Sequence, residues 1–126
     1  MSEPSLIAIV DDDAAMREAL YDLLQVEGFR AVTFPDAEAF LDHFDDREIA
    51  CLITDVRMPG LDGVDLQQQL RALGHMLPVI FVTSDEDEAT RARAMRSGAT
   101  AFFTKPLANA ELVRVLRDVL GSERGD

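Results

Sequence analysis

The chain has 126 residues and a formal charge of −12, from 24 acidic and 12 basic side chains, and 48% of its residues are apolar. This length and apolar content predict one globular domain with a single core. Nucleic-acid affinity comes largely from neutralising phosphates with Lys and Arg, so the acidic balance argues against direct nucleic-acid binding by this chain. No signal peptide is evident, no apolar run approaches the ~20 residues of a membrane span, and Cys51 is the single cysteine; we therefore expect a cytoplasmic protein.

Five apolar runs predict five strands. In chain order they are 6–10 (LIAIV), 30–34 (RAVTF), 51–54 (CLIT), 78–82 (PVIFV) and 101–103 (AFF). The first, third and fourth runs are nearly continuous in apolar residues, as in strands buried on both faces. The second alternates, which is typical of an edge strand.

Apolar residues recur at helical spacing after each strand. The clearest stripes are Met16–Leu20–Leu23–Leu24, Ala37–Phe40–Leu41–Phe44, Leu66–Leu70–Leu73 and Leu112–Val115–Leu116–Val119. The fourth helix, roughly 86–97, has only alanines and Met95 as apolar residues, so we expect a weakly anchored, mobile element; a small, lightly covered helix is the alternative. Strand and helix alternating five times predict an α/β fold, with a parallel sheet covered by helices on both faces.

Polar residues stand directly after the predicted strands. Asp11 and Asp12 follow the first strand, Asp55 the third, Thr83 the fourth, and Lys105, the one lysine of the chain, the fifth. Ligands of an open parallel sheet bind beyond the carboxyl ends of its strands. Three carboxylates at that edge predict a Mg²⁺ site that a phosphate would complete.

Several polar residues near the predicted strand ends have simpler structural explanations. Asp13 is a predicted helix N-cap, Asp62-Gly63 reads as a turn, and Thr83-Ser84 could cap the fourth helix. Each of these explanations accounts for the polar residue at one position. None accounts for polar residues at successive strand ends.

Four segments together resemble the receiver domains of bacterial two-component response regulators. They are VDDD (10–13), DVRMPGLDG (55–63), VTS (82–84) and FFTKP (102–106), within a match from about Leu6 to Leu120. The resemblance implies a flavodoxin-like, doubly wound, five-stranded parallel sheet in the order 2-1-3-4-5, with five helices. Residues 1–121 would form the receiver domain, and residues 122–126 a flexible tail or the start of a linker.

The resemblance also implies a role for individual residues. Asp55 is the implied phosphoacceptor, and Lys105 is the lysine that pairs with it. Asp11 and Asp12 are the acidic pair that holds Mg²⁺, with help from the Arg57 carbonyl. Thr83 and Phe102 are the implied switch residues, and the Lys105–Pro106 bond is one that is usually cis. The implied function is a phosphorylation-dependent signalling switch, a phosphoprotein that assists its own phosphorylation and dephosphorylation rather than an enzyme with a separate substrate.

The implied partners are a sensor histidine kinase or phosphotransfer protein, and an output protein or domain. Phosphorylation would change the surface formed by the fourth helix, fifth strand and fifth helix, through which the chain could also form a homodimer. Arg57 and Asp85 stand two residues after the acceptor and the switch threonine. We hypothesise that they pair across the mouth of the site and slow loss of the phosphoryl group; two solvated side chains are the alternative.

Three other interpretations stay open on the sequence alone. The chain could be the N-terminal receiver of a longer DNA-binding transcriptional regulator rather than a single-domain regulator. A haloacid-dehalogenase-type phosphatase would use Asp11 as nucleophile and Asp13 as acid, although 126 residues leave little room for a substrate cap. A flavin binder would need a hydroxyl- and Gly-rich loop where the three acids stand.

Overall fold

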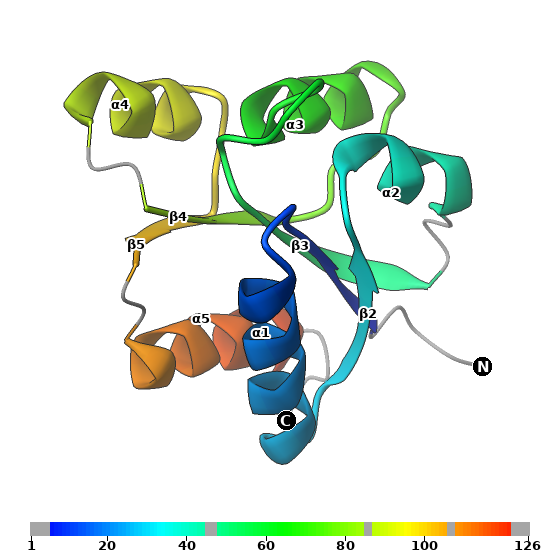
Figure 1. Cartoon of the computed structure of the whole chain (residues 1–126), viewed down its shortest axis with the longest axis vertical. Helices are drawn as coiled ribbons and strands as arrows, with labels where there is room; N and C mark the ends of the chain where they lie inside the picture. Colours follow the sequence, from blue (N-terminus) through cyan, green and yellow to red (C-terminus); the bar gives the residue numbers. More distant parts are fainter. Residues whose placement is uncertain (1–5, 45–47, 85–86, 106–107, 122–126) are drawn as a thin grey trace.

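The computed structural model describes residues 6–44, 48–84, 87–105 and 108–121 (Figure 1). The elements are β1 Leu6–Val10, α1 Ala14–Val26, β2 Arg30–Phe34, α2 Ala37–His43, β3 Ile49–Thr54, α3 Gly63–Ala72, β4 Val79–Thr83, α4 Glu88–Arg96, β5 Ala101–Thr104 and α5 Asn109–Gly121. All five predicted strands and helices are present. No helix in these ranges combines the length and apolar character needed to cross a membrane.

The strands form one parallel sheet in the order β2-β1-β3-β4-β5, which confirms the predicted fold class. Figure 1 shows α2, α3 and α4 on one face of the sheet and α1 and α5 on the other. Burial follows the predicted pattern, because β1, β3 and β4 are almost wholly buried whereas the edge strand β2 is half exposed.

Two apolar cores lie on the two faces of the sheet. Side chains alternate along a strand, so Ile7 and Ile9 pack with α1 and α5 while Ala8 and Val10 pack with α2, α3 and α4. Cys51 is a fully buried core residue, as predicted, and desolvation raises the pKa of its thiol to about 12.

Aspartates at the helix N-termini fix where the helices begin. Asp13 accepts hydrogen bonds from two backbone N–H groups of α1, which confirms the predicted cap. The prediction of a simple turn at Asp62 was incomplete, since its carboxylate caps α3 by accepting from the Asp65 N–H at 2.8 Å. Asp87, rather than Thr83 or Ser84, caps α4. Each cap satisfies backbone donors that lack a partner within the helix.

Helix α4 is attached to α3 mainly by polar contacts. Its buried residues within the described chain are only Thr90 and Ala94. Arg93 lies 3.2 Å from Asp62 Oδ2 and 3.2 Å from Asp65 Oδ1, and the Ser97 hydroxyl contacts the Gln67 side-chain oxygen. The small apolar contact expected from the sequence is therefore confirmed, and ion pairs to α3 add to it.

These ion pairs predict a local effect of Arg93→Ala. Because the three side chains are partly exposed to solvent, the free energy of unfolding should fall by less than about 1 kcal/mol. Hydrogen exchange of the α4 amides should nevertheless accelerate several-fold, since α4 has little apolar contact to retain it. Arg96→Ala removes an exposed arginine from the same helix and is the control; equal exchange in the two variants would contradict this prediction.

Candidate functional site at the carboxyl edge of the sheet

The structure brings three predicted carboxylates together beyond β1 and β3. One oxygen each from Asp11, Asp12 and Asp55 lies within 4.8 Å of the others. Asp11 and Asp55 are buried, whereas Asp12 is exposed. The cluster thus has a closed side within the protein and an open side toward solvent.

Backbone hydrogen bonds hold the two buried acids at the tips of their strands. The Asp11 N–H donates to the Phe34 carbonyl at 3.3 Å, and the Asp55 N–H donates to the Val10 carbonyl at 3.2 Å. Each side chain then folds over the following turn: Asp11 Oδ1 accepts from the Asp13 N–H at 2.9 Å, and Asp55 Oδ1 accepts from the Arg57 N–H at 3.1 Å. These bonds leave the second oxygen of each carboxylate available to other groups.

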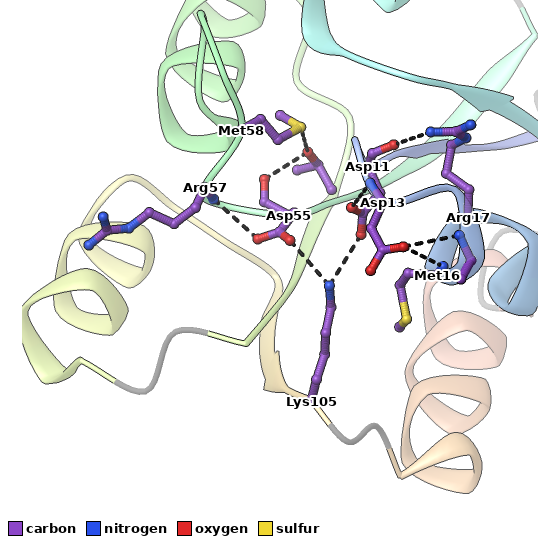
Figure 2. A network of polar contacts seen from close by, with 10 residues as sticks. Asp11, Asp13, Met16, Arg17, Asp55, Arg57, Met58 and Lys105 are labelled. Carbon is purple, nitrogen blue, oxygen red and sulfur yellow. Dashed lines mark hydrogen bonds and ion pairs between the residues drawn. The ribbon is translucent and has the colours of Figure 1, made fainter.

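Lys105 supplies the nearby positive charge. Its Nζ lies 3.2 Å from Asp55 Oδ2 and 3.5 Å from Asp11 Oδ2 (Figure 2). The backbone N–H of Lys105 donates to the Thr83 carbonyl at 2.8 Å, which extends the pairing of β4 and β5 and positions the lysine. Burial lowers the pKa of Lys105, but attraction to Asp11 and Asp55 outweighs burial, so the pKa is raised.

Asp11 remains energetically costly as a charged group. Its pKa is raised by burial, although the Asp13 N–H and Lys105 act in the opposite direction. A carboxyl whose pKa is higher in the folded than in the unfolded state destabilises the fold as pH rises above its ordinary range. The charge is thus retained at a cost in stability, as at many functional sites.

Asp11→Asn should therefore stabilise the metal-free protein at neutral pH. We expect the thermal midpoint to rise by about 3 °C, the effect of roughly 1 kcal/mol on a domain of this size. The difference in thermal midpoint between Asp11→Asn and wild type should increase as pH rises from about 4 toward 7, since at lower pH the side chain at position 11 is neutral in both proteins. Thermal unfolding in EDTA across this range measures the effect, and a lower midpoint for Asp11→Asn at pH 7 would contradict it.

The predicted switch residues lie on one face of the sheet. Thr83 ends β4 and is buried, and Phe102 in β5 is 8% exposed. Phe102 is in register with Phe81, two residues before Thr83, so both predicted switch side chains face the α3–α4 layer. The guanidinium of Arg91, on α4, lies 5.3 Å from the centre of the Phe102 ring. Phe103 packs on the opposite face.

Some predicted features fall outside the described residues. Asp85 and Pro106 are among them, so the pairing of Arg57 with Asp85 and the Lys105–Pro106 bond stay predictions. Arg57 itself is exposed.

Sequence reasoning overlooked two further contacts of the site. The Arg17 guanidinium donates to the Asp11 carbonyl at 2.7 Å, and the Thr54 hydroxyl donates to the Asp55 carbonyl at 3.0 Å. Both are side-chain contacts to backbone carbonyls, so hydrophobic periodicity does not indicate them.

The donor set fits a hard divalent cation. Mg²⁺ prefers oxygen ligands, retains several waters, and is commonly bound by one or two carboxylates together with a phosphate. Asp11, Asp12 and Asp55 offer carboxylate oxygens, and the exposure of Asp12 leaves room for waters or a phosphate. Lys105 adds a cation beside Asp55 without closing the open side.

Comparison with known proteins gives consistent results. The family model for the response regulator receiver domain matches residues 7–117. Response regulator protein TmoT of Ectopseudomonas mendocina is 41% identical over 118 residues, covering 94% of this chain and 54% of TmoT. Transcriptional regulatory protein FixJ of Bradyrhizobium diazoefficiens is 37% identical over 120 residues, covering 95% of this chain and 58% of FixJ.

A solved structure shows the same arrangement. The crystal structure of FixJ-N superposes with a TM-score of 0.84 and 32% identity, covering 94% of each chain. The present chain spans about half the length of the curated relatives it matches.

Proposed function

Because the chain belongs to the response regulator receiver domain family, we propose that it is a phosphorylation-dependent switch with Asp55 as the phosphoacceptor. The main observation in support of Asp55 is its position relative to the neighbouring charges. The buried Asp55 carboxylate lies 3.2 Å from Lys105 and within the same cluster as Asp11 and Asp12. Asp55 therefore has both a neighbouring cation and two carboxylates able to share a metal ion.

The proposed reaction transfers a phosphoryl group from a phosphohistidine. An oxygen of Asp55 forms a bond to phosphorus while the phosphorus–nitrogen bond breaks, and the imidazole leaves with the electron pair. Bound Mg²⁺ would neutralise the charge on the phosphoryl oxygens. Lys105, 3.2 Å from Asp55, would stabilise the same charge, and the hydrogen bond from Arg57 N–H orients the Asp55 carboxylate.

The family match does not favour the enzymatic and flavin-binding alternatives. A haloacid-dehalogenase-type phosphatase would use Asp11 as nucleophile, but Lys105 lies closer to Asp55, at 3.2 Å, than to Asp11, at 3.5 Å. The chain is a signalling domain by family, and we propose that it assists its own phosphorylation and dephosphorylation.

The proposed output runs through Thr83 and Phe102. A phosphoryl group on Asp55 adds negative charge and acceptor oxygens. Movement of the Thr83 hydroxyl toward them would free space on the face that Phe102 shares. The surface of α4, β5 and α5 would then change, and a second copy of the chain or an output protein or domain would bind it.

The proposed partners follow from this reaction. A histidine kinase or phosphotransfer protein would supply the phosphoryl group. One relative is by name a transcriptional regulatory protein, so transcriptional control is among the proposed outputs.

Intact mass spectrometry tests the proposal directly. The protein is incubated with acetyl phosphate, with Mg²⁺ or with EDTA, and modified peptides are mapped. We expect one phosphoryl group at Asp55 only when Mg²⁺ is present. A folded protein that gains no mass with Mg²⁺ and this donor would contradict the proposed function.

A further inference from the structure

Both backbone polar groups of Asp11 are hydrogen-bonded, and its carbonyl belongs to the peptide unit that joins it to Asp12. The Asp11 N–H donates to the Phe34 carbonyl at 3.3 Å, and the Asp11 carbonyl accepts from Arg17 Nη1 at 2.7 Å. Figure 2 shows the Arg17 guanidinium meeting this carbonyl on the side of the loop away from Lys105. Arg17 thus binds the loop backbone and leaves the carboxylates free.

The hydrogen bond from Arg17 to the Asp11 carbonyl also affects the position of Asp12. Within the described ranges, the exposed carboxylate of Asp12 accepts no hydrogen bond, so contacts of its own do not orient it. A peptide unit is planar, and fixing the Asp11 carbonyl oxygen therefore also fixes the N–H and Cα of Asp12. The direction in which Asp12 leaves the backbone consequently depends on the hydrogen bond from Arg17.

The fold explains why Arg17 can reach this carbonyl. Arg17 lies in the first turn of α1, where side chains lean toward the helix N-terminus. The Asp13 cap holds that turn against the loop, since Asp13 accepts from the N–H groups of Ala15 and Met16. The half-buried Arg17 side chain therefore extends back along the helix to a residue six positions earlier.

We propose that Arg17 is a positioning residue for the metal site, holding the Asp11–Asp12 peptide so that both carboxylates face one cation. A purely electrostatic role would have the opposite sign, because a guanidinium near the cluster repels a divalent cation and its removal would strengthen binding. Positioning predicts that removal weakens binding, as loss of a residue that orients metal ligands does. The inference rests on the proposed metal site.

Titration of Mg²⁺ by isothermal calorimetry distinguishes these roles. Arg17→Met, which retains much of the apolar stem, should bind Mg²⁺ about tenfold more weakly than wild type. Arg17→Lys, which retains the charge and a donor, should lose less. The control Arg96→Met removes a charge from an exposed position on α4 and should match wild type.

Thermal unfolding in EDTA accompanies each titration, so that affinities are compared for folded proteins. Equal or tighter Mg²⁺ binding by folded Arg17→Met would overturn the role of Arg17 while leaving the metal site in place. Should Arg17→Met not fold, Arg17→Leu, which also removes the donors and keeps an apolar side chain, decides, and affinity equal to or tighter than wild type would overturn the inference. Absence of Mg²⁺ binding by wild type would overturn both the metal site and the inference.

Discussion

Asp55→Asn is expected to gain no phosphoryl group from acetyl phosphate and Mg²⁺ under conditions in which wild type is fully modified. An amide oxygen is a poor nucleophile, and loss of the nucleophile should lower the rate by about a thousandfold or more. Asparagine has the size of aspartate and can still accept the hydrogen bond from the Arg57 N–H. The variant should therefore fold, so that the loss reports chemistry rather than unfolding.

Asp65→Asn is the matched control for this prediction. The same substitution then falls on a half-exposed acid of α3 whose partner is Arg93, and phosphorylation should match wild type. Mass spectrometry with peptide mapping measures both variants. A phosphoryl group on Asp11 or Asp12 in Asp55→Asn would place the acceptor elsewhere. Turnover of a small phosphate ester that survives Asp55→Asn would support a phosphatase instead.

The fold could be predicted from local patterns because most of its determinants are local. Continuous apolar runs identify buried strands, and an acid before a helical stripe identifies a cap, as at Asp13. Strand limits were less accurate. β3 begins at Ile49 rather than Cys51, since Leu6 also pairs with Ile49, across a register shift between Leu6 and Ile7. Pro78 accepts a hydrogen bond from the Leu52 N–H but has no N–H of its own, and β4 begins one residue later.

The residues of the site were found because parallel strands place their carboxyl ends at one edge, whatever the details of packing. Contacts between side chains distant in sequence could not be found in this way. Arg93 and Asp62 are 31 positions apart and meet only once α3 and α4 lie side by side on the sheet. The contact from Arg17 to Asp11 depends on a rotamer and a loop conformation that hydrophobic patterns do not encode.

Gly63→Ala should have the largest effect on stability among substitutions near the site. Gly63 is the first residue of α3, and its N–H donates to the Val56 carbonyl at 2.8 Å. A Cβ at this position would overlap the Asp55 carbonyl oxygen and lie 3.1 Å from Phe81 Cε1. Because backbone and a buried ring both block the methyl group, the free energy of unfolding should fall by about 3 kcal/mol, the upper part of the range for overpacking.

A loss of stability in Gly63→Ala would show that position 63 requires glycine because of close packing, and not because of the turn predicted at Asp62-Gly63. The φ angle of Gly63 is not positive, so alanine could adopt the backbone conformation, and in a helix alanine is favoured over glycine by about 1 kcal/mol. If the glycine served only to form a turn, Gly63→Ala would be neutral or stabilising. Urea unfolding measures the difference, with Gln68→Ala on the exposed side of α3 as the control.

The same substitution should also slow phosphorylation of the protein that remains folded. The atom displaced by the methyl group is the carbonyl oxygen of Asp55 itself, so the acceptor must move relative to Lys105 and the two acids of the β1–α1 loop. General destabilisation would leave the rate per folded molecule unchanged at low temperature, whereas misplacement of the nucleophile lowers it. A Gly63→Ala protein with lower stability but a normal rate per folded molecule would show that Asp55 keeps its position when α3 moves away.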